Sequence, residues 1–195
     1  MRKATITRET RETEINIDLN LDLAAEKNKI VTGFGFADHM LDLMSHWAGM
    51  GLNITCQGDM EVDAHHSLED IGICLGQAFA EAIGPRTGIN RVGWSRIPMD
   101  ESMAEAIVDI SGRPFLVYQG DDLLPQTVAG QEKDIWREFF KSFAFNAKLN
   151  LHILFHYGTN SHHLLESAFK AVGMALRQAV VQSRSGILST KGALD

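Results

Sequence analysis

The sequence predicts an α+β fold made of two similar β-β-β-α-β-α halves, with mixed sheets covered on one face by helices. Three observations support this prediction. Segments with alternating polar and apolar residues, typical of half-buried strands, give way in each half to segments with helical spacing. The order of these segments is the same in both halves of the 195-residue chain. In addition, a short histidine-rich motif occurs once in each half.

This motif begins a long apolar segment in each half. It reads His65-His66-Ser67-Leu68-Glu69 first and His162-His163-Leu164-Leu165-Glu166 ninety-seven positions later. Aligned on the motif, residues 65–83 and 162–180 share seven identities over nineteen positions. A fixed internal repeat indicates a repeated structural unit. We therefore expect a duplicated domain, divided into residues 1–90, residues 91–182 and a C-terminal tail of residues 183–195.

The first half is expected to contain four strands and two helices. Its strands show alternation or short apolar runs, and they are residues 4–9, 13–23, 30–34 and 52–56. Residues 26–29 form the expected turn between the second and third of these strands. Helical spacing predicts helices at 37–49 and from Ala64 onward, and Gly84-Pro85 ends the second helix.

The second half repeats this order. Its expected strands are residues 92–99, 103–110, 115–118 and 149–155, and its expected helices are residues 134–147 and 161–182. Asn160 is a candidate N-cap of the last helix, because its side chain can accept hydrogen bonds from the first turn. The tail is rich in Ser, Gly and Lys, and we expect it to be either mobile or docked in a site.

Composition restricts the possible functions. The net charge is −7, from 25 acidic and 18 basic residues, which disfavours an extended nucleic-acid interface. No apolar run approaches the length of a membrane-spanning helix. The two cysteines, Cys56 and Cys74, do not indicate a disulfide framework. The expectation is a soluble protein, most simply cytoplasmic.

The repeated motif has the chemistry of a metal site. On a helix, Glu69 is a near neighbour of both His65 and His66, because residues three and four apart share a face. Adjacent histidines diverge by about 100°, so one helical turn can offer imidazoles to two ions. Imidazole and carboxylate together suit zinc, manganese or iron. The alternative is a structural or surface histidine pair, but two copies in register disfavour it.

Two further residues lie at similar places upstream of the motifs. His39 begins one predicted helix, and Glu138 lies ninety-nine positions later in the equivalent helix. His39 is a candidate ligand, with a buried, hydrogen-bonded histidine as the alternative. His46, His152 and His156 show no such pattern and are expected to be structural.

The chain resembles the imidazoleglycerol-phosphate dehydratase family in six motifs that occur in the same order. They are Arg8-Glu9-Thr10-Arg11-Glu12-Thr13, Asp38-His39-Met40-Leu41-Asp42, His65-His66-Ser67-Leu68-Glu69-Asp70, Ser111-Gly112-Arg113-Pro114, Asn160-Ser161-His162-His163-Leu164-Leu165-Glu166 and Ser189-Thr190-Lys191-Gly192. The sequence shows no phosphatase segment, so it resembles the monofunctional form. The resemblance implies a duplicated fold of the ribosomal protein S5 domain 2-like class. It also implies a 24-subunit homo-oligomer built from trimers, with two Mn²⁺ ions per active site between subunits.

The resemblance also implies roles for individual residues. Glu12 matches the proposed acid/base glutamate of the family. The implied metal ligands are His39, His65, His66, Glu69, His162, His163 and Glu166. The implied phosphate-binding residues are Arg91, Arg113, Lys170, Ser189 and Lys191. Two positions depart from the family pattern: Leu43 replaces a glutamine, and Glu138 stands where some members have histidine. Glu138 could bind metal directly, support a ligand by a hydrogen bond, or be solvated.

The metal ligands, the phosphate-binding residues and Glu12 that the resemblance implies suit one reaction of a small phosphorylated imidazole. The implied activity is dehydration of D-erythro-imidazoleglycerol phosphate to imidazole-acetol phosphate in histidine biosynthesis, through a metal-bound imidazolate/diazafulvene intermediate. The metal ions act as Lewis acids, and Glu12 transfers the proton. Two alternatives remain, a dinuclear metallohydrolase and a non-enzymatic metal-binding assembly. The affinity order of divalent metals favours zinc over manganese, so the bound metal depends on availability.

Overall fold

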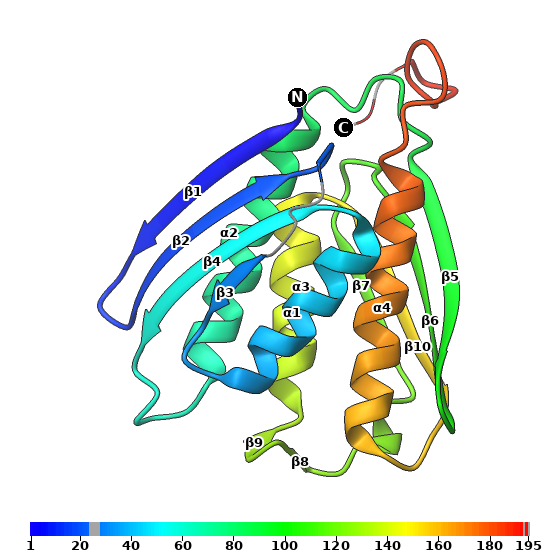
Figure 1. Cartoon of the computed structure of the whole chain (residues 1–195). Helices are drawn as coiled ribbons and strands as arrows, with labels where there is room; N and C mark the ends of the chain where they lie inside the picture. The colour runs from blue at the N-terminus through cyan, green and yellow to red at the C-terminus, as the bar shows by residue number, and fades with distance from the viewer. Residues whose placement is uncertain (24–27, 193, 195) are drawn as a thin grey trace.

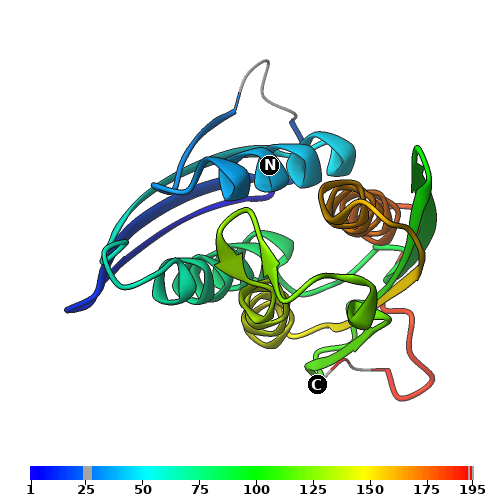
Figure 2. The ribbon, with the colours of Figure 1, turned by 90° about the horizontal axis from the view of Figure 1, so that it is seen from below.

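The computed structural model describes residues 1–23, 28–192 and 194. These residues form two four-stranded sheets and four α-helices. The helices lie between the two sheets (Figures 1 and 2). The predicted α+β class is therefore confirmed. The predicted turn at residues 26–29 lies partly outside the described residues.

The two sheets share one strand order. The first sheet runs β1(Lys3–Glu9), β2(Thr13–Asn20), β4(Gly51–Gly58) and β3(Lys29–Val31). The second sheet runs β5(Val92–Met99), β6(Ser102–Asp109), β10(Asn150–Tyr157) and β7(Phe115–Gln119). In each sheet the first three strands are antiparallel and the fourth is parallel to its neighbour. The predicted mixed sheets are confirmed, and the shared order supports the expected duplication.

Each sheet buries one face under two helices, as alternation along its strands requires. In β2, Ile15, Ile17 and Leu19 are buried, while the residues between them are exposed. Helices α1(Gly35–Ala48) and α2(His65–Ile83) pack on the first sheet, and α3(Asp134–Ala147) and α4(Ser161–Ala179) pack on the second. The helices also pair across the halves, α2 with α3 and α1 with α4. The core therefore lies between the sheets.

Two glycines of the repeat allow these helix pairs to approach closely. A Cβ atom on Gly76 of α2 would lie 2.6 Å from the carbonyl oxygen of Phe143 in α3. A Cβ atom on Gly173 of α4 would lie 2.4 Å from the carbonyl oxygen of Met44 in α1. Contacts this short are sterically excluded, so both positions require glycine. Met44 and Phe143 are ninety-nine positions apart, the same spacing that relates His39 to Glu138.

The residues at two helix ends explain why the helices begin or end there. Asn160 caps α4, because its side-chain oxygen accepts hydrogen bonds from the backbone N–H groups of His162 and His163. This confirms the predicted N-cap. Gly49 ends α1 in the left-handed conformation, with φ of 68°, which glycine adopts without strain.

Several predicted boundaries shift. β2 ends at Asn20 and α4 at Ala179, three residues earlier than predicted in each case. The sequence prediction also missed three short elements before α3, which are η1(Asp121–Leu123), β8(Thr127–Val128) and β9(Gln131–Glu132). Two-residue strands are too short to show any periodicity. Among the described residues, no helix is both long and apolar enough to cross a membrane.

Candidate active site

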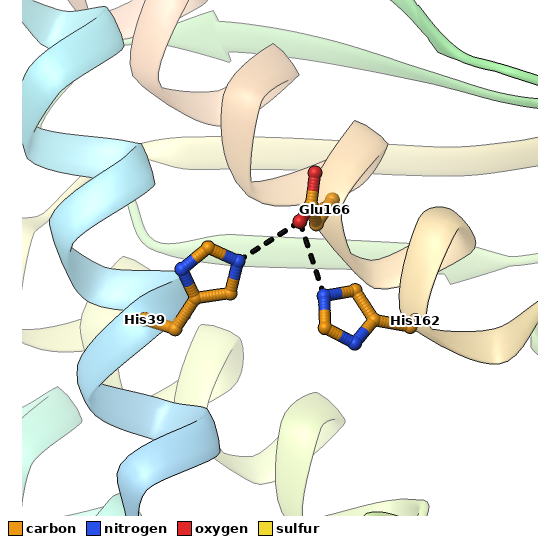
Figure 3. A group of neighbouring side chains, drawn as sticks. All are labelled: His39, His162 and Glu166. Carbon is orange, nitrogen blue, oxygen red and sulfur yellow. Dashed lines mark hydrogen bonds and ion pairs between the residues drawn. The ribbon is translucent and has the colours of Figure 1, made fainter.

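Helices α1 and α4 bring three candidate metal ligands together. His39 Nε2 lies 2.8 Å from Glu166 Oε1, and His162 Nε2 lies 3.1 Å from the same oxygen (Figure 3). His162 and Glu166 are one helical turn apart on α4, as the motif spacing predicts. His39 reaches them from the facing helix α1, which Gly173 allows to pack closely. A residue of the first half thus joins two residues of the second.

Lys170 completes the surroundings of this cluster. Its Nζ lies 2.6 Å from Glu166 Oε2, and both side chains are nearly buried. Burial alone would raise the pKa of Glu166, but hydrogen bonds from Lys170 and His39 outweigh it and lower this pKa from 4.5 to about 2. Glu166 is therefore ionised at neutral pH. The anionic oxygen faces two imidazoles, a donor set that suits a divalent cation.

The cluster fits a metal ion by its chemistry and its spacing. The ligand atoms of His39, His162 and Glu166 all lie within 4.8 Å of one another. In the part of the chain that the structure describes, no other group of three or more His, Cys, Asp or Glu residues meets this criterion. The ring of Phe36 packs edge-on against the His162 ring, with centroids 5.0 Å apart. This contact restricts the orientation of the imidazole.

The equivalent residues of the first half are less closely assembled. His65 Nε2 lies 3.7 Å from Glu69 Oε2, so the i, i+4 pair is present. Glu138, which corresponds to His39, instead has its Oε2 2.7 Å from Lys141 Nζ. The side chains of His65 and Glu69 are each about two-fifths exposed. They are accessible for contacts outside their own chain.

The second histidine of each motif contacts a carboxylate that the sequence prediction did not select. His66 Nδ1 lies 3.0 Å from Asp59 Oδ2, and His163 Nδ1 lies 2.7 Å from Glu101 Oε2. The hydrogen bond to Asp59 raises the pKa of His66, and the bond to Glu101 raises the pKa of His163. The same histidine contact, with backbone hydrogen bonds, holds the pKa of Glu101 well below its usual range. No sequence spacing links these pairs, because each joins separate segments of the fold.

Glu12 lies in the turn between β1 and β2. Its Oε2 is 3.9 Å from His66 Nδ1, and its side chain is 54% exposed. The carboxylate is therefore close to the first motif and accessible to a small molecule.

Four of the five predicted phosphate-binding residues line one cavity. Arg91, Arg113, Ser189 and Lys191 contribute to a cavity of about 530 Å³ between the second sheet and the tail. Two nitrogens of Arg91 donate to Asp109, at 2.6 and 2.9 Å, and a third donates to the carbonyl oxygen of Leu188 at 2.6 Å. Two basic guanidinium groups, a lysine and a hydroxyl are suited to bind a phosphate. Lys170 lies elsewhere, beside Glu166.

The phosphate-type cavity and the His39 cluster lie at opposite ends of α4, as Figure 1 shows for the tail and the helix N-terminus. The backbone N–H of Arg91 donates to the carbonyl oxygen of Ala179 at the C-terminal end. His162 is in the first turn of the same helix. At 1.5 Å per residue, the seventeen residue steps from His162 to Ala179 span about 25 Å.

The fold and the site define an α+β protein in which histidine and carboxylate clusters at helix N-termini are suited to divalent metal. A family model described as imidazoleglycerol-phosphate dehydratase matches residues 32–176. A relative of that name from Nitratidesulfovibrio vulgaris is 58% identical over 194 residues, covering 100% of this chain and 98% of its own. The chain belongs to the imidazoleglycerol-phosphate dehydratase family, and the prediction of an enzyme of this family is confirmed.

Two solved structures agree. Imidazoleglycerol-phosphate dehydratase from Staphylococcus aureus is 37% identical with a TM-score of 0.82, and the match covers 93% of this chain and 99% of that one. The Pyrococcus furiosus protein, solved in complex with (S)-C348, is 33% identical with a TM-score of 0.84. That match covers 97% of this chain and 100% of the other. The family model ends before the tail and begins after Glu12, but the full-length relative spans both.

Proposed function

We propose that the chain dehydrates D-erythro-imidazoleglycerol phosphate to imidazole-acetol phosphate, a step of histidine biosynthesis in the cytoplasm. Family membership supports the reaction class. The observation that supports it most directly is the cluster of His39, His162 and Glu166, since these donors suit a divalent ion. The cavity lined by Arg91 and Arg113 matches the phosphate of the substrate.

The active site is proposed to form between copies of the chain. The substrate is roughly 10 Å long at ordinary bond lengths. The His39 cluster and the phosphate-type cavity are separated by about 25 Å along α4, and the substrate is too short to span this distance. One copy therefore supplies the cluster and another supplies the cavity. The homo-oligomer proposed here is a 24-subunit particle built from trimers.

Two Mn²⁺ ions per active site are the proposed cofactors. Their ligands would come from His39, His65, His66, Glu69, His162, His163 and Glu166. Ions held by these residues would supply Lewis acidity, which favours ionisation of the substrate imidazole and loss of the neighbouring hydroxyl. Glu138 remains a candidate ligand, in competition with its contact to Lys141.

The protein's own groups hold the substrate and transfer the proton. Glu12 is ionisable, exposed and 3.9 Å from His66, so it is the proposed general base and acid for the carbon-bound proton. Arg91, Arg113, Ser189 and Lys191 hold the phosphate by charge-assisted hydrogen bonds. Lys170 keeps Glu166 ionised in this scheme and also remains a candidate for phosphate binding from a neighbouring copy.

Turnover and assembly test the proposal together. Purified protein loaded with Mn²⁺ should convert imidazoleglycerol phosphate in a coupled assay, lose activity after chelation, and recover it when Mn²⁺ returns. Light scattering should show a smaller species, such as a trimer, after chelation. Absence of turnover in the metal-loaded protein would refute the proposed activity. Bound metal without turnover would favour a metal-binding assembly instead, and hydrolysis of a phosphoester would favour a dinuclear hydrolase.

A further inference from the structure

We infer that Glu101 is a positioning residue, which fixes the orientation and the tautomer of His163 so that its Nε2 can bind a metal ion. This inference deepens the proposed function, because it depends on His163 being a ligand. It concerns a residue that the sequence prediction did not select.

Glu101 connects the β5–β6 turn to the start of α4. Its Oε2 accepts a hydrogen bond from His163 Nδ1 at 2.7 Å. Its Oε1 accepts from the backbone N–H groups of Asn160, at 2.8 Å, and Thr159, at 3.2 Å. The hydroxyl of Ser102 donates to the same oxygen at 2.9 Å. One carboxylate therefore holds both the segment that caps α4 and the imidazole one turn further on.

In the first half, the residue equivalent to Glu101 is not the hydrogen-bond partner of the second motif histidine. Glu12 lies in the β1–β2 turn, as Glu101 lies in the β5–β6 turn, since β1 and β2 correspond to β5 and β6. Yet the near partner of His66 Nδ1 is Asp59 at 3.0 Å, and Glu12 is 3.9 Å away. Asp59 thus leaves the Glu12 carboxylate accessible. In the second half, Glu101 itself is the partner of the histidine, His163, within the part of the chain that the structure describes.

The chemistry of the pair determines the tautomer. A carboxylate can only accept hydrogen bonds, so His163 Nδ1 must donate its proton to Glu101. The lone pair of a neutral imidazole is then on Nε2, which is the form that a metal ion requires. Among the described residues, the acid nearest to Nε2 is Asp100, whose Oδ2 is 3.9 Å away, beyond hydrogen-bond distance.

Glu101→Gln tests the inference, because it reverses the direction of the hydrogen bond to His163 Nδ1 without changing the size of the side chain. Four donor contacts converge on the Oε1 position, because the Thr159 hydroxyl also reaches it, at 3.5 Å. The amide oxygen must therefore stay there, and the NH₂ group must face His163. An NH₂ group donates, which requires Nδ1 to accept and moves the ring proton to Nε2. We expect Mn²⁺ titration of the chelator-treated protein to show one ion per subunit bound about 10- to 100-fold more weakly.

Glu105→Gln is the matched control. Glu105 is on the same β5–β6 hairpin as Glu101, and its Oε2 lies 2.9 Å from Nε2 of His156. His156 is not a candidate ligand. This variant should bind both ions as tightly as the parent. ¹⁵N spectra of the metal-free parent, which need no variant, should show the Nδ1–H tautomer for His163.

Three outcomes overturn the inference. The first is an Nε2–H tautomer for His163 in the parent. The second is unchanged Mn²⁺ affinity in Glu101→Gln. The third is equal weakening in the Glu105→Gln control, which would indicate a general loss of stability. If the parent itself binds no Mn²⁺, the proposed metal site fails and the role of Glu101 at that site fails with it.

Discussion

His39 and Glu166 are in contact across the boundary between the two halves, with His39 Nε2 2.8 Å from Glu166 Oε1. The contact exists because α1 and α4 approach closely at Gly173. The geometry of the candidate site therefore depends on the packing of the core, and a small change at the helix crossing should reach the site.

Gly173→Ala tests this dependence. The added Cβ would lie 2.4 Å from the carbonyl oxygen of Met44, so α1 must move away from α4. We expect a loss of about 1–3 kcal/mol in the free energy of unfolding, typical of overpacking, together with weaker Mn²⁺ binding. Gly35→Ala is the control, because it lies on α1 with no atom within 4 Å of an added Cβ. Equal stability of the two variants in denaturant titrations would contradict the prediction.

The ionisation of Glu166 predicts a pH dependence of the metal-free protein. Its pKa is lowered from 4.5 to about 2 in the folded state. Glu166 therefore stabilises the fold above about pH 4.5, and this contribution is lost as the pH falls toward 2. The stability difference between the parent and Glu166→Gln should be largest above pH 4.5 and should shrink at lower pH. Lys170→Met removes the closest cation and should reduce this dependence. A difference that is constant from pH 6 to pH 2 would argue against it.

Glu12→Gln separates chemistry from binding. Glutamine keeps the size of the side chain but cannot accept a proton at neutral pH. Turnover should fall at least about a hundredfold, the lower range for a general acid or base. Metal content and oligomer mass should not change, since the Glu12 carboxylate lies 3.9 Å from the nearest candidate ligand, His66. Near-normal turnover would assign the proton transfer to another group.

Asp109→Asn tests how the phosphate-type cavity is held. Asp109 accepts two hydrogen bonds from Arg91, and Arg91 in turn holds the tail at Leu188. Asparagine removes the charge and one of the two acceptors, so KM for the phosphorylated substrate should rise about tenfold, the loss of roughly one charge-assisted hydrogen bond, with a smaller change in kcat. Glu105→Gln, which disrupts the similar pair with Arg96 on the same two strands, should leave KM unchanged. An unchanged KM in Asp109→Asn would show that Arg91 needs no such support.

Most of the fold could be predicted from the sequence, because alternation and helical spacing are local signals. The strands of the two sheets and the four long helices follow from them. The repeated motif contains His162 and Glu166, and the position of His39 opposite Glu138 made His39 a candidate. The β8–β9 hairpin has two-residue strands, which leave no period to detect. Glu101 was missed because its contact with His163 joins segments 62 residues apart. Asp59 was missed because its contact with His66 depends on the path of the loop between β4 and α2, which has no periodic pattern.

The orientation of Glu138 also could not be predicted. The matched glycine contacts support its equivalence to His39 in position. However, the direction of its side chain depends on competition with Lys141, one turn away on the same helix. A side-chain torsion of this kind leaves no trace in residue spacing.

The length of α4 between the His39 cluster and the phosphate-type cavity has a consequence for particles assembled from two different variants. If each site takes one part from each of two copies, two differently inactivated chains should complement each other. His162→Ala damages only the cluster, and Arg113→Ala damages only the cavity, so each variant alone should be inactive. Dissociated and reassembled as an equal mixture, they should regain about a quarter of the parent activity, because about a quarter of the sites would combine two intact parts. Activity that never exceeds that of the separate variants would place a complete site within one chain.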